Sequence, residues 1–555
     1  MPTSPVRASG LRQRVFRALL CGACLFGPGV AGAQQPSPPP PSTADLERRI
    51  RQLEETVRRL EAERAQDHQA RTVVPPSGPP DPGVTPEPLL PPESPGTPPD
   101  SGGGSSGSAT PPAVQGGGER KAEGGSSAGS GSREGSGRSE SLAGWDEKRG
   151  FYLRSSDNKF NLRLTGQIQG DYRAFLDGDD RTDIDTFLVR RARLGIEATV
   201  LNYYEFRLLP DFSNSQAPGV PAQERIQDAY LNIHYWDAFQ FEVGKFKQPF
   251  SYEQLIQDRF VPTLERSMID QLVPARDEGV MVHGQKLLSD RLDYGLSVFN
   301  GEINGDFDTD KRKDLSARVA VRPLNSPSFS PVLRGLQLGV AGTIGVEQEP
   351  VNPNNLRTPA TVLWFQFNPA VRADGLRRRL SPEVVYFYRG LGFAAQYFYQ
   401  EQRLRPAFFG PGSEFFLDVP FRGFYVLSTL LLTGEERTTY SEAIKPLRPF
   451  DPCHPLTCPG AWELVVRTSR LVVGDEVFQP LRTGRTAFIS LADPTRYSNG
   501  ATELTLGFNW YLNGFVRMQF NWEHAWFDDP VRLGPGPGGL LRHQDSLLTR
   551  FQVIF

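Results

Sequence analysis

Polar and apolar residues alternate with a period of two through most of the chain after Trp145. In the stretch KFNLRLTGQIQGDYR, Phe160, Leu162, Leu164 and Ile168 share one set of alternate positions, and mostly Asn, Arg, Thr and Gln fill the other. The same alternation returns in RARLGIEATV, DAYLNIHYW, ELTLGFNWYLN and VRMQFNWEHAWF. Because successive side chains of a strand point to opposite faces, this period predicts β-strands.

The predicted strands carry Arg, Glu, Gln and Asp on one face and Leu, Phe, Tyr and Trp on the other. Strands of about ten residues with hydrocarbon on one side and water on the other are typical of outer-membrane barrels, which close so that no edge stays unpaired. Counting along the chain gives sixteen strands if residues 361–367 (TVLWFQF) belong to a long loop. The pattern predicts an all-β fold, a sixteen-stranded antiparallel transmembrane β-barrel over residues 145–555.

The final stretch, DSLLTRFQVIF, has the same alternation up to the last residue. Phe551, Val553 and Phe555 fall on the predicted lipid face. A terminal aromatic strand resembles the signal that the bacterial barrel-insertion machinery reads. We therefore expect that machinery as a partner, and outer-membrane lipid around the barrel.

Two cysteines, Cys453 and Cys458, lie in the segment DPCHPLTCPG of the predicted barrel. In an oxidising compartment such a close pair indicates a disulfide that closes a loop. A metal site with His454 is the alternative, although a closed site needs four ligands. The strand count places this long segment on the periplasmic side.

The first 33 residues have the features of an export signal. Four arginines between residues 7 and 17 precede the apolar run ALLCGACLF, and the AGA that ends at Ala33 fits a cleavage site. We predict that residues 1–33 are a signal peptide; an uncleaved anchor and a lipoprotein modified at Cys24 are the alternatives.

The predicted periplasmic segment, residues 34–71, contains the heptad-like stretch ADLERRIRQLEETVRRLEAERA. Its apolar spacing of four and three predicts a coiled coil at about residues 44–65. The repeat covers only about two and a half heptads, so we expect it to associate only where chains are already held together. Its composition favours two strands, which a trimeric body could override, and a single solvated helix is the alternative. The seam residues are Leu46, Ile50, Leu53, Val57 and Leu60.

Residues 72–144 are rich first in Pro and then in Gly and Ser. Such a composition cannot bury a core, so we predict a disordered linker.

Composition and charge exclude several classes of function. The net charge of −3 offers no general basic field for nucleic acid. None of the six histidines follows a nucleophile motif, and no phosphate loop, dinucleotide fingerprint or zinc motif occurs. We therefore expect neither an enzyme, nor a metal site, nor a cofactor.

Several segments resemble the phosphate-selective porin family, the O and P type. They include FLVRRARLGIEATVLNYYEFRLLPDFS, IQDAYLNIHYWDAFQFEVGKFKQPFSYEQ, LERSMIDQLVPARDEGVMVHG and FRGFYVLSTLLLTGEER. The resemblance runs in order from about Phe151 to Phe555. It implies a sixteen-stranded barrel, a homotrimer and the passive diffusion of anions.

In this family the long loop after GKFKQPF folds inward and forms the constriction. The alignment puts a family lysine at Gln254, a serine pair at Gln257 and Asp258, another lysine at Arg259, and an arginine at Arg266. Two cations persist, one is lost and Asp258 adds a negative charge. Because an anion site depends on charge-assisted hydrogen bonds, we expect weakened phosphate binding.

Alternation places both signs of charge on the lumen face, whereas a selective anion pore needs mainly one sign. Each arginine there is either a pore-lining cation or a wall charge paired with a carboxylate. The predicted pore-lining basic residues are Arg163, Arg191, Arg193, Arg207 and Arg318, and the further lumen arginines are Arg173, Arg322, Arg467, Arg517 and Arg550.

The sequence thus predicts an outer-membrane porin for small hydrophilic solutes and ions, anion or phosphate preferring, in a Gram-negative-type bacterium. The alternative is a structural barrel whose N-terminal coil and linker, a periplasmic extension, tether the membrane to peptidoglycan or a periplasmic partner.

Overall fold

The computed structural model describes residues 142–146, 150–176, 185–213, 225–301, 311–348, 350–409, 415–482, 488–532 and 539–555. The predicted signal peptide, the coiled-coil seam (Leu46, Ile50, Leu53, Val57 and Leu60) and nearly all of the predicted linker lie outside these residues. Within them, no helix is long and apolar enough to cross a membrane.

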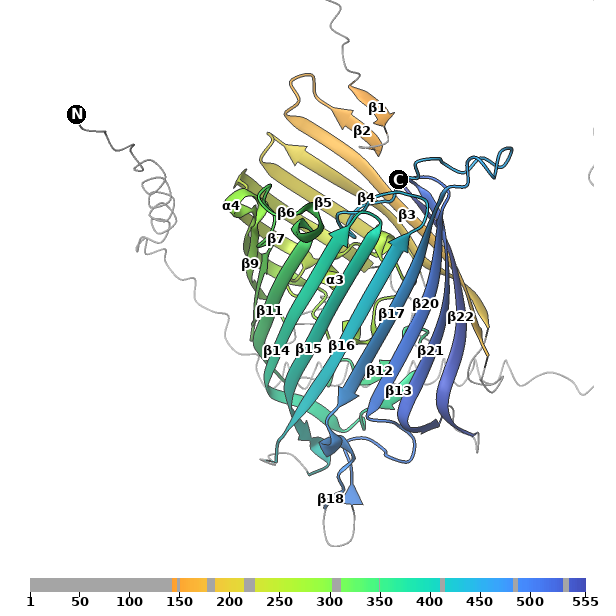
Figure 1. Cartoon of the computed structure of the whole chain (residues 1–555). Helices are drawn as coiled ribbons and strands as arrows, with labels where there is room; N and C mark the ends of the chain where they lie inside the picture. The colour runs from red at the N-terminus through yellow and green to blue at the C-terminus, as the bar shows by residue number, and fades with distance from the viewer. Residues whose placement is uncertain are drawn as a thin grey trace, which may run out of the picture. The chain divides into compact units, whose positions relative to one another are not determined.

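The described chain is a closed antiparallel β-barrel of sixteen strands, as predicted (Figure 1). The barrel strands are β3 (Phe160–Phe175), β4 (Thr186–Val200), β5 (Tyr204–Asp211), β6 (Arg225–Trp236), β7 (Phe239–Lys247), β8 (Arg276–Lys286), β9 (Leu292–Phe299), β10 (Asp314–Val321), β11 (Leu336–Glu347), β14 (Val371–Tyr388), β15 (Leu391–Pro406), β16 (Leu417–Leu431), β17 (Ala461–Val473), β20 (Gly500–Tyr511), β21 (Val516–Arg532) and β22 (Leu540–Ile554).

The remaining elements are short. They are β1 (Ala143–Asp146), β2 (Gly150–Arg154), α3 (Tyr252–Leu255), η1 (Asp258–Phe260), η2 (Met268–Gln271), α4 (Leu287–Asp290), α5 (Pro331–Arg334), β12 (Asn355–Arg357), β13 (Leu363–Gln366), η3 (Ala407–Phe409), η4 (Asp475–Phe478), β18 (Leu481–Arg482) and β19 (Phe488–Ile489).

The barrel closes by pairing β22 with β3. The last residue takes part, because Gly166 N donates to Phe555 O (2.9 Å) and Phe555 N donates to Gly166 O (3.1 Å). A Cβ at Gly166 would lie 2.1 Å from Phe555 Cζ, so only glycine leaves room for the terminal ring. Phe551 points outward and is exposed, and β2 continues the seam along β3 where Phe555 ends.

The two ends of the barrel differ in their connections. Turns of two to four residues follow β4, β6, β14 and β20, at the same end as the C-terminus, and most longer connections lie at the opposite end. Residues 361–367 lie in the connection between β11 and β14, where β13 pairs only with β12, so the predicted loop is confirmed.

The connection of residues 432–460, between β16 and β17, is long although it lies at the C-terminal end. It contains Cys453 and Cys458, whose thiols are free, so the predicted disulfide is not formed in the structure. Backbone hydrogen bonds close the turn instead: Cys458 N donates to His454 O (2.9 Å), and Asp451 N donates to Cys458 O (3.1 Å).

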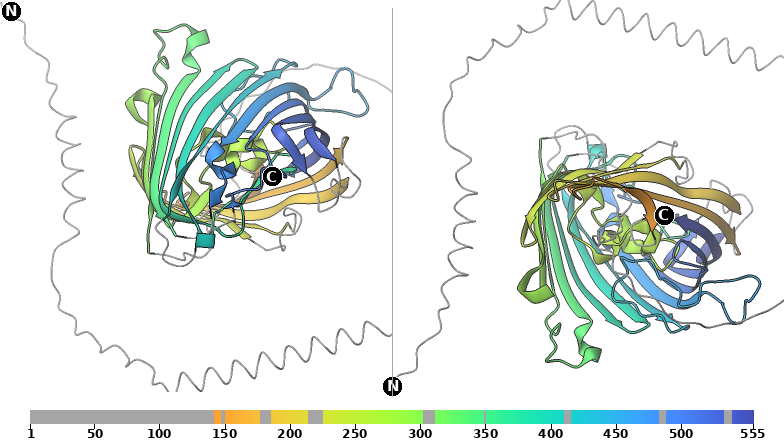
Figure 2. Two further views of the ribbon diagram at one scale, coloured as in Figure 1. Left: turned by 90° about the horizontal axis from the view of Figure 1, so that it is seen from below. Right: turned by 90° about the horizontal axis from the view of Figure 1, so that it is seen from above.

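Residues 248–275, called here the inward loop, connect β7 to β8 and carry α3, η1 and η2. They fold into the barrel, where both end-on views show them enclosed by the strands (Figure 2). Phe250, Met268 and Ile269 are fully buried there.

The expectation of a polar inner face on every strand holds only in part for β14–β17, called here the apolar sector, where large apolar residues share the inner face with polar ones. Phe398, Phe421, Tyr425 and Val465 point inward and are at most 2% exposed. They belong to one apolar cluster with residues of the inward loop and of the β11–β14 connection. Period-two alternation cannot distinguish an inner wall that water covers from one that loops cover.

Candidate pore constriction

Asp258 of the inward loop is the centre of a buried charge cluster. Its carboxylate contacts Arg266 of the same loop (2.5 Å), Arg193 of β4, and Arg191 of β4 (3.6 Å). Arg193 also pairs with Asp211 of β5 (2.7 Å). These contacts fasten the loop to the wall, because each buried charge has an opposite charge beside it.

Glu265 is the centre of a second cluster and was not singled out from the sequence. It contacts Arg190 of β4 (2.7 Å), Arg550 of β22 (2.9 Å), Arg173 of β3 (3.0 Å) and Arg191 (3.5 Å). The inner face of β3–β6 and β22, called here the charged sector, thus holds the loop through its arginines. The sequence shows Glu265 only as a charged residue in the predicted constriction loop, because its arginine partners lie far away in the chain.

The two carboxylates stay ionised in this setting. Burial alone would raise their pKa values, but the surrounding arginines hold the pKa of both Asp258 and Glu265 well below the usual range. The side chain of Asp258 is only 3% exposed. The expectation that Asp258 presents a negative charge to passing ions therefore needs correction, because three arginines enclose and neutralise that charge.

The glutamines of the predicted constriction are placed differently. Gln254 is buried in α3, and its backbone carbonyl accepts a hydrogen bond from Lys247 Nζ (2.5 Å). Lys247 Nζ also donates to Ile256 O (2.8 Å). The ammonium group of Lys247 is therefore hydrogen-bonded to carbonyl groups of the inward loop. Gln257 is half-buried and precedes η1 as its N-cap residue.

The predicted pore-lining arginines face inward but are paired. Arg191 and Arg193 bind the inward loop, as described above. Arg207 contacts Asp228 (3.1 Å) and Glu197, and Arg318 contacts Glu383. Arg163 is the most exposed of the five, with 41% of its side chain accessible and Glu197 at 3.8 Å. The alternative interpretation, wall charges paired with carboxylates, therefore holds for most of them.

The apolar sector holds the opposite side of the inward loop. Phe250 packs edge-on against Phe398, with ring centroids 6.2 Å apart. Ile269 packs on the backbone of Gly423, where a Cβ would lie 2.5 Å from Ile269 Cγ2. Two hydrogen bonds fix the start of the loop: Ser251 Oγ donates to Gln396 Oε1 (2.8 Å), and Tyr252 N donates to Glu383 Oε2 (2.8 Å).

Carbonyl groups of the inward loop also accept hydrogen bonds from polar side chains of the wall. Asn509 Nδ2 and Gln519 Nε2 donate to Pro262 O (2.8 and 2.9 Å), and Arg467 Nη1 donates to Glu265 O (2.6 Å). These partners come from β17, β20 and β21. Sequence reasoning did not find the two amides, because loop carbonyls leave no signal in side-chain patterns.

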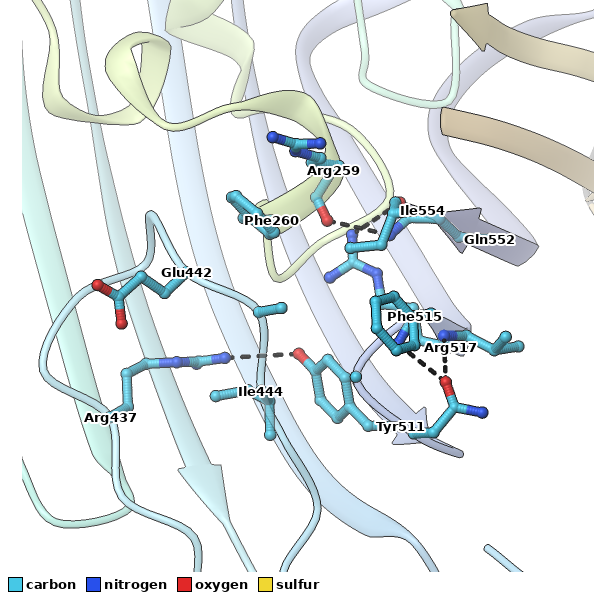
Figure 3. Close-up of a pocket in the computed structure, with 14 residues that line it drawn as sticks. Arg259, Phe260, Arg437, Glu442, Ile444, Tyr511, Phe515, Arg517, Gln552 and Ile554 are labelled. Carbon is cyan, nitrogen blue, oxygen red and sulfur yellow. Dashed lines mark hydrogen bonds between the residues drawn. The ribbon is translucent and has the colours of Figure 1, made fainter. Parts of the chain in front are cut away.

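Two adjoining pockets, both open to solvent, lie beside η1 at the C-terminal end of the barrel. Arg259 and Phe260 line both pockets. Figure 3 shows the backbone carbonyl of Arg259 directed toward Gln552 of the wall. The basic residues that line the two pockets are Arg163, Arg259, Arg437, Lys445 and Arg517.

Arg259 and Arg517 differ from the other described arginines on the inner face of the barrel strands and in the inward loop. All the others except Arg542, which lies at the opposite end of β22, have a carboxylate oxygen within 4.0 Å, and these two have none. Arg259 Nη1 donates to Thr165 Oγ1 (2.6 Å), and Arg517 Nη2 donates to Gln552 Oε1 (3.2 Å). Gln552 Nε2 in turn donates to Arg259 O (3.0 Å). Gln552 thus links the guanidinium of Arg517 to the backbone of Arg259.

Comparisons with known proteins agree with the resemblance noted in the sequence. The family described as phosphate-selective porin O and P matches residues 162–357. Porin O of Pseudomonas aeruginosa is 23% identical over 442 residues, which cover 74% of this chain and 91% of that protein.

Similar solved structures include the trimer form of OmpT from Vibrio cholerae, 11% identical, covering 71% of this chain and 99% of that one, with a TM-score of 0.42. An anion-selective porin from Comamonas acidovorans is 10% identical, covering 71% of this chain and 100% of that one, with a TM-score of 0.42. The segment that is similar to the phosphate-selective porin O and P family runs from β3 into the β11–β14 connection and includes the whole inward loop.

Proposed function

We propose that this chain is an outer-membrane porin through which small hydrophilic solutes diffuse passively, with a modest preference for anions. The observation that carries the preference is the pair Arg259 and Arg517 at one mouth of the barrel, two cations that hydrogen-bond to neutral side chains and have no carboxylate oxygen within 4.0 Å. The charges elsewhere on the described inner wall are largely compensated, so they add little net field along the path.

Strong selection of phosphate is not part of the proposal. The family lysine position is Gln254, which is buried, and Arg266 is paired with Asp258. A tight phosphate site needs several cations whose hydrogen bonds are free to reach the ligand. Here the inward loop uses its charges to hold itself in place.

The test is the conductance of the purified full-length protein in planar lipid bilayers. We expect ohmic pores at low bias and a reversal potential in a KCl gradient that favours chloride modestly. Micromolar phosphate should leave the chloride current unchanged. A flat baseline from a folded, heat-modifiable barrel would contradict the porin proposal, and block by micromolar phosphate would contradict the weak selectivity.

The homotrimer and the periplasmic extension also belong to this proposal. A related role, in which the N-terminal segment tethers the barrel to peptidoglycan or to a periplasmic partner, can coexist with diffusion. Deleting residues 34–141, which ends before β1, separates the two roles. We expect unchanged conductance together with weaker co-sedimentation with cell-wall material; lost conductance would show that the barrel does not work alone.

A further inference from the structure

The outer face of the barrel changes character along β14, β15, β16 and β17. Toward the C-terminal end these strands expose apolar residues such as Leu380, Tyr397, Phe424 and Leu464. Toward the opposite end the outward positions become charged, mostly with arginine. The outward arginines, called here the arginine band, are Arg372 and Arg378 (β14), Arg403 and Arg405 (β15), Arg422 (β16) and Arg470 (β17).

The strand register shows that the boundary between apolar and charged outward residues is continuous across β14–β17. Leu380 pairs with Tyr399, whose other neighbour is Arg422 on β16. Phe424, two residues further along β16, pairs with Arg470 on β17. Each strand thus passes from apolar to charged next to the place where its neighbour does. A sharp boundary of this kind, with aromatic residues beside it, is expected where hydrocarbon meets lipid headgroups.

Acidic residues accompany the arginine band but do not balance it. Arg403 pairs with Asp418 (2.9 Å), and Arg378 pairs with Glu401 (3.9 Å). Arg405 pairs with Asp374 (2.5 Å), and Arg470 pairs with Asp528 of β21 (2.6 Å). Six arginines against these four carboxylates leave a net charge of +2.

The excess charge sits at two defined places. Arg372 lies directly opposite Arg405 in the register of β14 and β15, and Asp374 pairs with Arg405. Arg422 lies one strand away from Arg470 and is offset by two residues, and Asp528 pairs with Arg470. Among the described residues, neither Arg372 nor Arg422 has a carboxylate oxygen within 4.0 Å, and both are exposed. Like charges opposite one another destabilise a sheet. An anion bound at these places would therefore reduce the repulsion between neighbouring arginines.

We propose that the arginine band binds the phosphate groups of an anionic, phosphorylated membrane lipid. The planar guanidinium group donates two parallel hydrogen bonds to a phosphate, and its position just beyond the apolar surface matches the headgroup level of a lipid whose chains cover that surface. A free phosphate ion would gain the charge contacts without the apolar surface. The proposal rests on the barrel lying in a membrane and is independent of what passes through its pore.

The described outer face of β9–β11 gives an internal comparison. Its outward residues include Leu296, Leu315, Leu338 and Ile344, and these strands carry no outward arginine of their own. Arg378 of β14, which lies opposite Ile344, marks the edge of the arginine band on this side. We therefore expect phosphorylated lipid on one side of the barrel.

The test measures how much lipid A, a glycolipid with two phosphate groups, stays bound to the detergent-purified full-length protein in native mass spectrometry. The variant is the double substitution Arg372→Gln and Arg422→Gln. The matched control is Arg389→Gln, which removes an exposed arginine at the opposite end of β14. We expect wild type and control to retain the lipid equally, and the double variant to bind it about tenfold more weakly.

Three results would overturn the proposal: equal retention by the double variant, equal retention of the same glycolipid without its phosphates, and displacement of the lipid by inorganic phosphate at equimolar concentration. Heat-modifiable mobility shows that each variant is folded. Bilayer conductance measured on the same samples separates this proposal from the porin proposal, because the double variant should conduct as wild type does.

Discussion

The charged sector and the apolar sector hold the same inward loop by different physical means. In the charged sector, Asp258 and Glu265 are each surrounded by arginines, so the loop is fixed by buried ion pairs. In the apolar sector, Phe250 and Ile269 pack against Phe398 and Gly423. The difference shows that most lumen arginines of this barrel act as structural residues. An arginine that is paired with a loop carboxylate adds little net field to the ion path, so it contributes little to ion selection.

The largest effect is expected from removing a central carboxylate of the charged sector. Glu265→Gln leaves Arg173, Arg190, Arg191 and Arg550 without their shared counter-ion. Breaking a buried ion pair from one side costs about 3–5 kcal/mol, so the urea midpoint should fall sharply. The surplus positive charge should also raise the preference for chloride.

Glu401→Gln is the matched control for that substitution. Its carboxylate lies on the outer face, 3.9 Å from Arg378, and both side chains are at least 37% exposed. An exposed pair of this kind contributes about 0–1 kcal/mol. Similar unfolding midpoints for the two variants would show that the Glu265 cluster does not stabilise the barrel.

The apolar sector should respond without a change of charge. Phe398→Ala removes a fully buried ring that packs on Phe250, and it should cost about 3 kcal/mol, at the lower end of the range for such truncations because the loop can settle. A loosened inward loop should raise single-channel noise and leave the reversal potential unchanged. A changed ion preference in Phe398→Ala would contradict the division of roles between the sectors.

The smallest effect is expected at Asp270, near the end of the inward loop. Burial is the main cause that raises the pKa of this carboxyl to about 7, although Arg266 opposes the shift. As pH falls from 8 to 6 the group takes up a proton, and the loop loses one negative charge. The reversal potential should therefore move slightly toward chloride across this range. Asp270→Asn should remove the pH-dependent step, and an unchanged step in that variant would assign it to another group.

Much of the barrel could be predicted from the sequence because a strand in a membrane leaves a local signal. The alternation in KFNLRLTGQIQGDYR and the final aromatic residues gave sixteen strands and a last strand that closes on β3. The assignment of residues 361–367 to a long connection, which the count of sixteen strands required, is also confirmed.

The contacts of the constriction could not be predicted in the same way, because they depend on register between distant strands. Arg517 faces inward as alternation predicts, but its lack of a carboxylate partner becomes visible only when β20, β21 and β22 are aligned. Glu265 contacts arginines that lie up to 285 residues away in the chain. The inward-facing Phe398 and Phe421 were unexpected. The alternation of residues within a strand does not show which loops will pack against its inner face.

The most direct test of the central claim is the reversal potential of the double variant Arg259→Gln and Arg517→Gln in a KCl gradient, with Arg389→Gln as the control. If two uncompensated arginines at the mouth set the preference for anions, the double variant should lose about two- to fivefold of its chloride preference at unchanged folding stability. An unchanged reversal potential would contradict the account, because the preference would then arise from charges that the structure pairs.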